Sequence, residues 1–384
     1  MNVTLVTTIY PPAIGGPAVY AWDVSRRLRE RGHRVDVVTP TPQDGGDPYV
    51  HGTSAFVPPV KFLRGFVRSL LVLLAVMKAG RNADVLFVQS PGHVGYIVTM
   101  AGWLLRKPVV VRFPGDVAWE HAFAAGRTTK TLHEFLRAPE GGRGTRLVLR
   151  LQKLVLTRAR QVIAPSEYIR HALIEAYGVD PARIHAIYHS VDVPERRNGQ
   201  PAGTGPTLVY VGRLVPHKCI PDLLDAVARL AAHFPDIRLQ LVGDGPDAAA
   251  LKDYAAERGL GDRVTFMGNV KRDAAVAAMR QADVLILPSL WESLSHVAIE
   301  AIATGVPVVA TRIPGLDEVL TDEVAVLVPP RAPDALAGAI ARVLTDRDLA
   351  RRLVAAGRAR ALGTFSWQQN LPRLEDVLER ARRA

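Results

Sequence analysis

The sequence is poor in cysteine and in aromatic residues, and both shortages exclude classes of protein. Cys219 is the only cysteine among 384 residues, so neither an internal disulfide nor a zinc-finger pair can form. This usage fits a reducing compartment. Aromatic residues make up only 6% of the chain and do not alternate with the basic residues. Stacking platforms for nucleic-acid bases are therefore missing, and we expect no nucleic-acid partner.

Long apolar runs are also missing. The longest, Leu70–Met77, is far shorter than the roughly 20 residues that span a bilayer. The first residues, Met1–Thr7, lack the basic start and apolar stretch of a signal peptide and predict a buried strand. We therefore expect a cytoplasmic protein. The net charge of +11 favours an anionic partner, such as a nucleotide or a phospholipid.

Length and periodicity predict two α/β domains. The chain exceeds the roughly 250–300 residues at which one core stops growing. Short apolar, β-branched runs alternate with helical patterns from end to end, which indicates doubly wound parallel sheets covered by helices on both faces. We expect a first domain at 1–193, a Gly- and Pro-rich linker at 194–206 and a second domain at 207–365. The last helix, 366–384, is expected to return to the first domain.

The strands of the first half are predicted at Val3–Thr7, Val35–Thr39, Val85–Val88, Val109–Arg112, Val162–Ala164 and Ile184–Ile187. Those of the second half are predicted at Thr207–Val211, Ile237–Val242, Val264–Met267, Val284–Leu287, Val306–Ala310 and Ala325–Val328.

Ligands of such sheets bind beyond the carboxyl ends of the strands, so the motifs that follow strands are the candidates for chemistry. Gly212 ends the strand Thr207–Val211 and permits close backbone approach. Arg213 and Lys218 follow it, and two cations there match the negative charges of a pyrophosphate. The alternative is a pair of bases in a surface loop.

A second motif follows the strand Val284–Leu287. Ser295 is predicted to cap a helix whose free N–H groups and positive dipole end suit a phosphate. Glu292 lies in the loop and Glu300 inside the helix, so they suit two hydroxyl-bearing ends of one extended ligand. For Glu300 the alternative is a solvated helix face.

The E-x7-E spacing of Glu292 and Glu300, with the upstream Gly-Arg-Leu…Lys segment, resembles the GT-B glycosyltransferases of family 4. The resemblance covers nearly the whole chain. It implies two Rossmann-like domains facing a cleft, with the donor in the second domain and the acceptor in the first. The implied reaction is a retaining, metal-independent hexosyl transfer from a UDP-, GDP- or ADP-sugar to an acceptor hydroxyl of a glycan, a glycolipid or a small molecule. No cofactor is expected. A GT-B sugar-nucleotide binding protein or epimerase without transferase activity is the alternative.

The resemblance also implies roles for individual residues. Arg213 and Lys218 would hold the donor diphosphate, Glu300 the ribose hydroxyls and Glu292 the donor sugar. The remaining implied donor contacts are the main chain around Leu294, Ser295 and His296, the base site near Asn269 and Val270, and the glycine loop at Gly15 and Gly16.

One departure from the family concerns the reacting centre. Many relatives carry a His after the strand equivalent to Val109–Arg112, and this chain does not. Asp116 is the expected substitute, ahead of His121, and with Arg213, Lys218 and Glu292 it completes the predicted catalytic set. The alternative for Asp116 is a helix N-cap.

Other motifs favour no competing reaction. Gly243-x-Gly245-x-x-Ala248 partly matches a dinucleotide fingerprint, but no acidic residue ends the next strand. Asp346-x-Asp348 lies between two helices, where capping is expected. No third ligand completes a zinc site with His185 and His189.

Two basic segments remain. Arg143, Arg146, Arg150 and Lys153 share one helix face, with Leu147, Leu151 and Leu154 predicted near its opposite side. Lys61, Arg64 and Arg68 begin an apolar helix. Either segment is predicted to lie on an anionic membrane. The alternatives are packing on the sheet for the second segment and a solvated face for the first.

Overall fold

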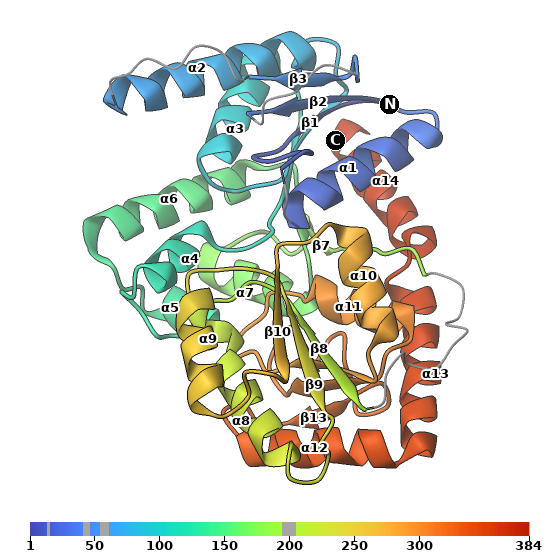
Figure 1. Cartoon of the computed structure of the whole chain (residues 1–384). Coiled ribbons are helices and arrows are strands. Elements are labelled where there is room, and N and C mark those ends of the chain that lie inside the picture. The colour runs from blue at the N-terminus through green and yellow to red at the C-terminus, as the bar shows by residue number, and fades with distance from the viewer. Residues whose placement is uncertain (14–15, 41–46, 54–60, 194–204, 384) are drawn as a thin grey trace. The chain divides into compact units, whose positions relative to one another are not determined.

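The computed structural model describes residues 1–13, 16–40, 47–53, 61–193 and 205–383, with the side chains of 61–64 left out. The chain clusters into two compact units (Figure 1). One comprises Met1–Tyr188 with Asn370–Ala384, and the other His189–Gln369. Each is built on a parallel sheet with helices, which confirms the predicted α/β class.

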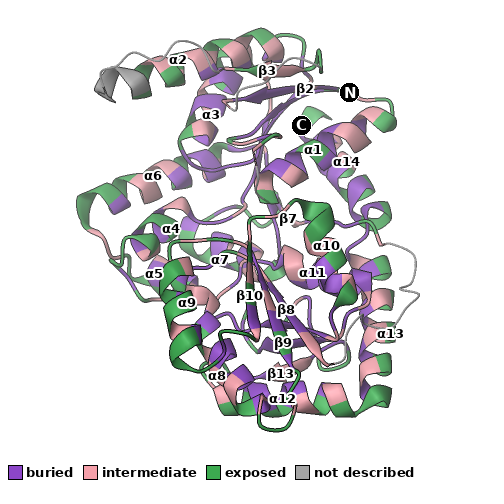
Figure 2. Cartoon of the chain, viewed as in Figure 1, coloured by how far each residue is buried: buried purple, intermediate pink, exposed green. Residues whose placement is uncertain are grey.

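The first unit has a seven-stranded parallel sheet in the order β3-β2-β1-β4-β5-β6-β7. Its strands are β1 (Asn2–Val6), β2 (Arg34–Thr39), β3 (Val50–Gly52), β4 (Val85–Val88), β5 (Val109–Arg112), β6 (Gln161–Ala164) and β7 (Ile184–Ala186). Its helices are α1 (Gly16–Glu30), α2 (Lys61–Gly80), α3 (His93–Leu105), α4 (Val117–Ala124), α5 (Leu132–Arg137), α6 (Gly142–Arg158) and α7 (Glu167–Tyr177). Every residue of β4, β5 and β6 is buried (Figure 2), because helices cover both faces of these central strands.

The second unit has a six-stranded parallel sheet in the order β10-β9-β8-β11-β12-β13. Its strands are β8 (Thr207–Val211), β9 (Arg238–Val242), β10 (Val264–Gly268), β11 (Val284–Leu287), β12 (Val308–Thr311) and β13 (Val326–Val328). Its helices are α8 (Ile220–Leu230), α9 (Ala248–Glu257), α10 (Arg272–Gln281), α11 (His296–Thr304), α12 (Pro333–Thr345) and α13 (Arg347–Thr364), with a 3-10 turn, η1, at Pro216–Lys218.

All twelve predicted strands are confirmed to within two residues at their ends. The prediction missed β3, which has three residues and lies at the edge of the first sheet. An edge strand of this length buries too little surface to need an apolar run, and Val50 is its only aliphatic residue.

The units divide near, but not at, the expected residues, and most of the predicted linker lies outside the described residues. Residues 189–193 belong to the second unit, where Val191 pairs with Ser366. The last helix, α14 (Trp367–Arg383), belongs to the first unit only from Asn370 onward.

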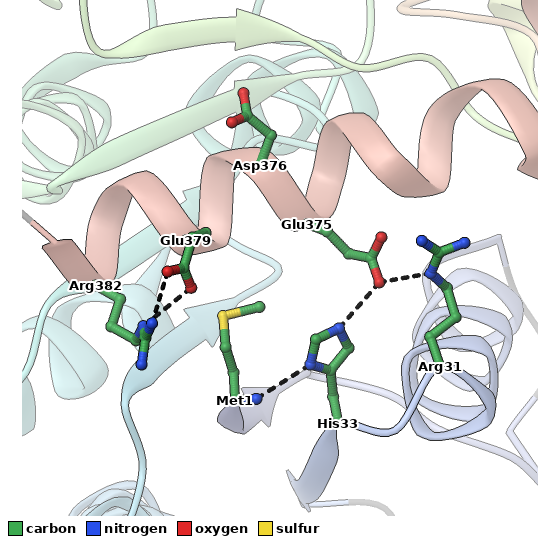
Figure 3. A pocket seen from close by; sticks show the side chains of 7 residues that line it. All are labelled: Met1, Arg31, His33, Glu375, Asp376, Glu379 and Arg382. Atoms are coloured by element: carbon green, nitrogen blue, oxygen red, sulfur yellow. Dashed lines mark hydrogen bonds and ion pairs between the residues drawn. The ribbon is translucent and has the colours of Figure 1, made fainter.

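An ion pair and a histidine contact join α14 to the first unit, on which it also buries Leu374, Val377 and Leu378. The Glu375 carboxylate accepts from Arg31 Nε at 2.7 Å and contacts His33 Nε2 at 2.9 Å. Figure 3 shows both side chains pointing toward Glu375. Among the residues that the structure describes, no helix is long and apolar enough to cross a membrane.

Candidate functional site

The candidate site lies where the strand order of the second sheet reverses. β8 and β11 pair in parallel at the centre of the sheet, and the chain winds outward from them in opposite directions. The loops after these two strands border a cavity of about 240 Å³. Among its lining residues are Gly212, Arg213, Lys218, Glu292, Leu294, Ser295 and His296, all predicted from the sequence as donor contacts.

Glycine fixes the path of the loop after β8. The N–H of Gly212 donates to the Val242 carbonyl at 2.9 Å. Gly243 has a φ of +133°, and a Cβ there would lie 2.0 Å from the Gly212 carbonyl oxygen. Only glycine permits this approach of two backbones. The Tyr210 hydroxyl donates to the Arg213 carbonyl at 2.9 Å, which holds the next residue of the loop.

Positive charge dominates this side of the cavity. Burial, with the charges of Lys218 and Arg213, lowers the pKa of His217 to about 4. The imidazole is therefore neutral at pH 7, and the two flanking cations carry the charge. The Leu290 N–H donates to the His217 carbonyl at 2.8 Å, so the two loops are joined directly.

Glu292 is held from two directions. Its Oε1 atom accepts from Lys218 Nζ at 2.5 Å and from Ser289 Oγ at 3.0 Å. Ser289 is fully buried, and its carbonyl accepts from the Thr311 hydroxyl at the end of β12. Gly315 has a φ of +88°, and a Cβ there would lie 2.1 Å from the Glu292 carbonyl oxygen. The backbone and the carboxylate of Glu292 are thus both fixed.

The helix after β11 begins as predicted. Ser295 caps α11 by accepting from the Ala298 N–H at 3.3 Å, and Gly305 ends the helix with a φ of +83°. The helix is nine residues long and its first residue, His296, lines the cavity. Its free N–H groups therefore add positive potential beside Arg213 and Lys218.

Glu300 lies one turn further along α11 and does not line the cavity. Its carboxylate accepts from Arg272 Nε at 2.9 Å. Arg272 begins α10, just after the predicted base site at Asn269 and Val270. The pair therefore joins α11 to the segment that follows β10.

Sequence reasoning missed several residues of the site. His217 and Ser289 line the cavity, and Arg272 pairs with Glu300. Position after a strand, the signal that selected Lys218 and Glu292, could have selected His217 and Ser289 as well.

The structure corrects the role expected of Asp116, which lies in the first unit. Asp116 is fully buried and caps α4 by accepting from the Trp119 N–H at 2.8 Å. Gln152 Nε2 at 3.1 Å and the Tyr177 hydroxyl also donate to its carboxylate. Burial raises its pKa despite these hydrogen bonds. A carboxylate enclosed in this way is structural and is not presented to a ligand.

Three other residues predicted for the donor site or the reacting centre belong to the first unit: Gly15, Gly16 and His121. Gly15 lies outside the described residues, whereas Gly16 begins α1 and is exposed. His121, the second choice for the reacting centre, is exposed on α4.

Cys219 follows Lys218 and is buried. Its thiol contacts the Pro216 carbonyl. Burial, with the nearby Asp222 carboxylate, raises the pKa of the thiol to about 11.

Comparison with known proteins gives two family matches that together cover most of the chain. Residues 14–195 match the model of glycosyltransferase family 4, and residues 192–360 match that of the glycosyl transferases group 1. A D-inositol 3-phosphate glycosyltransferase of Geodermatophilus obscurus is 30% identical over 94% of this chain and 83% of its own length. A glycogen synthase of Mycobacterium tuberculosis is 28% identical over 96% of this chain and 92% of its own length.

Solved structures share the fold. A sucrose-phosphate synthase from Thermosynechococcus elongatus aligns with a TM-score of 0.77 and 24% identity, covering 98% of each chain. HepE of Anabaena, in complex with UDP-glucose, aligns with a TM-score of 0.76 and 19% identity, covering 98% of this chain and 99% of that one.

The buried network around Asp116 predicts a loss of stability when it is broken. Asp116→Ala removes a helix cap and deprives the buried Tyr177 hydroxyl and one N–H of Gln152 of their acceptor. We expect the free energy of unfolding, measured in urea, to fall by about 2–4 kcal/mol. His121→Ala, an exposed change on the same helix, should alter it by less than about 0.5 kcal/mol. Wild-type stability of Asp116→Ala would contradict the structural role.

Proposed function

The chain belongs to the GT-B glycosyltransferases of family 4, and from that membership we propose that it transfers a sugar from a nucleoside diphosphate sugar to an acceptor hydroxyl with retention of configuration. The observation that carries the proposal is the cavity at the β8–β11 switch point, where Arg213, Lys218 and the start of α11 converge. This arrangement suits a diphosphate, since two cations and a helix N-terminus meet its negative charge.

The same groups account for catalysis. When the bond between sugar and diphosphate breaks, its electron pair stays on the diphosphate oxygen, which gains negative charge. Arg213, Lys218 and the N–H groups of α11 stabilise that charge, and preorganised groups of this kind give the largest rate effects. Glu292 keeps Lys218 in place before the donor binds, since the two are already paired at 2.5 Å.

Retention follows from the side of attack. We propose no covalent intermediate on the protein. The acceptor hydroxyl attacks on the face that the diphosphate leaves, and its proton passes to the departing diphosphate oxygen. The new bond then has the configuration of the old one.

The nucleoside would lie beyond the diphosphate, toward α10. Glu300 accepts hydrogen bonds from the ribose hydroxyls, and Arg272 orients its carboxylate. The exposed Asn269 and its neighbour Val270 border the base. UDP-, GDP- and ADP-sugars all present the diphosphate and ribose that these residues would bind.

We also propose peripheral contact with an anionic membrane. Arg143, Arg146, Arg150 and Lys153 are all exposed on α6, and none has a side-chain partner among the described residues. Arg68 is exposed on α2, while the side chains of Lys61 and Arg64 lie outside the described residues. Many acceptors of glycosyl transfer are carried on lipids, and such a contact would bring the enzyme to them.

The donor site predicts activity losses without unfolding. Arg213→Ala, Lys218→Ala and Glu300→Gln should each lower turnover at least tenfold, since each removes a contact to the donor. Their melting temperatures should stay close to wild type. Arg351→Ala, which removes an exposed cation on α13, is the matched control and should keep full activity. Wild-type rates in any two of the three donor-site variants would refute the assignment.

The nucleotide of the donor can be identified by measuring the melting temperatures of wild type and of these variants with UDP-, GDP- and ADP-sugars. A ligand at 100 times its Kd stabilises the folded state by about 2.7 kcal/mol. The donor should raise the melting temperature of wild type and of Arg351→Ala more than that of Lys218→Ala.

The charge-stabilising role given to Arg213 and Lys218 predicts turnover without a divalent cation. These side chains supply the positive charge that a metal ion supplies in other transferases. Activity should therefore survive excess EDTA at close to its untreated value. A strict requirement for added Mg²⁺ or Mn²⁺ would contradict this proposal.

The stereochemical proposal is tested on the product. An α-linked donor should give an α-linked product, identified from the anomeric coupling constant in the NMR spectrum. A β-linked product would rule out retention and leave the donor-site assignment standing.

A further inference from the structure

Three packed helices of the first unit carry no acidic residue. These are α2, α3 and α6, of which α3 contacts both of the others. Their sequences contain neither Asp nor Glu, whereas basic residues occur along α2 and α6. The 37 acidic residues of the chain therefore all lie outside these three helices.

The same helices expose large apolar side chains. Twelve such side chains are exposed in the described part of the chain, and eight of them belong to these three helices. They are Phe66, Leu70 and Leu74 on α2, Tyr96, Trp103 and Leu104 on α3, and Leu147 and Leu154 on α6. Trp103 is 78% exposed. Apolar side chains gathered in this way mark a surface that binds something.

The leucines of α6 correct the sequence prediction. At about 100° per residue, Leu147 and Leu154 lie within roughly 40° of Arg143 around the helix. The buried side of α6 is instead formed by Thr145, Gln152, Val155 and Leu156. Leu147 and Leu154 therefore share the exposed side with the cations, which gives a mixed apolar and basic surface.

A hollow of about 970 Å³ lies at the end of α3 and α6. Trp103, Leu104 and Leu154 line it, together with Arg106, Lys107, Arg158 and Arg160. None of these four cations has a side-chain partner among the described residues. Among the residues that the structure describes, no acidic one lines the hollow, and its fifth cation, Arg382 of α14, pairs with Glu379. An anionic partner is therefore the one that complements it.

The hollow is separate from any substrate site at the strand ends. α3 ends at Leu105, shortly before β5 begins at Val109, and the Arg160 N–H donates to the Val109 carbonyl at 2.8 Å. The surface therefore lies at the amino ends of β5 and β6. Ligands of doubly wound sheets bind at the opposite, carboxyl ends.

We propose that this surface enters the interface of an anionic phospholipid bilayer. We call it the acid-free face, and it consists of Trp103, Leu104, Leu147 and Leu154 with Arg106, Lys107, Arg146, Arg150, Lys153, Arg158 and Arg160. Trp103 and the leucines lie at the boundary between headgroups and acyl chains, and the cations bind lipid phosphates. The inference rests on the membrane contact proposed above and not on the transfer reaction.

Charge argues against a second copy of the chain as the occupant. A two-fold interface would place this face on itself, and cations would then meet the same cations. A bilayer containing phosphatidylglycerol offers the opposite charge together with an apolar layer for Trp103.

The test uses the full chain and vesicles of phosphatidylcholine with or without phosphatidylglycerol, some with brominated acyl chains. Wild type should co-sediment with the anionic vesicles only, and bromine should quench its tryptophan fluorescence. Trp103→Phe should lose most of that quenching. Trp22→Phe is the matched control, since Trp22 is also exposed, at 43%, but lies on α1. It should be quenched as wild type is.

Further variants separate insertion from electrostatic attraction. Trp103→Ser with Leu104→Ser should weaken partitioning at least tenfold at constant salt. Arg146→Glu with Arg150→Glu should abolish binding at low salt. All these side chains are exposed, so melting temperatures should not change.

Three results would overturn the inference: no binding of wild type to anionic vesicles at low salt, undiminished quenching in Trp103→Phe, or a dimer in sedimentation equilibrium that Trp103→Ser dissociates. Turnover on a soluble acceptor, measured in parallel, should stay at wild-type rates in the Trp103 variants. If the proposed transfer reaction is wrong, only the turnover assay will fail. If the proposed membrane surface is wrong, only the vesicle assays will fail.

Discussion

Parallel pairing of β8 with β11 is the constraint on which the donor site depends. Because the strand order reverses between them, the loops after β8 and β11 leave the sheet in opposite directions and border a cavity. Lys218 and Glu292, 74 residues apart in the chain, meet there as an ion pair. The next strand, β12, braces the pair through Thr311, and Gly315 beyond it packs on the backbone of Glu292.

Much of this arrangement could be predicted from the sequence, because a strand buried on both faces must be apolar throughout. β4 and β11 show this directly, whereas the exposed edge leaves β3 without such a signal. Position after a strand likewise identified Arg213, Lys218 and Glu292. The ion pair between Lys218 and Glu292 could not be predicted, since the sequence gives the edge of the sheet and not the partner of a side chain. Asp116 failed for the same reason: a polar residue before a helix fits a cap and a ligand equally, and only burial decides.

The positive charge of the chain is used in two different ways. In the donor cavity the cations are few and one is already paired, so they act at contact distance and in fixed geometry. On the acid-free face they are many and have no side-chain partner in the described part of the chain, so they act over the Debye length of about 8 Å at physiological salt and are screened as ionic strength rises. The rotation of α6 about its own axis determines which of its side chains belong to the acid-free face. Thr145, Gln152, Val155 and Leu156 face inward, which leaves Leu147 and Leu154 on the outside together with the cations.

The lone cysteine has a consequence for experiment. Cys219 is buried, and a thiol with a pKa raised to about 11 is almost wholly protonated at neutral pH. Because the thiolate is the reactive species, maleimides and other thiol reagents will leave the native chain nearly untouched. We therefore expect the protein to serve as a cysteine-free background without any mutation. One cysteine introduced on an exposed helix would accept a spin label or a fluorophore at that position alone.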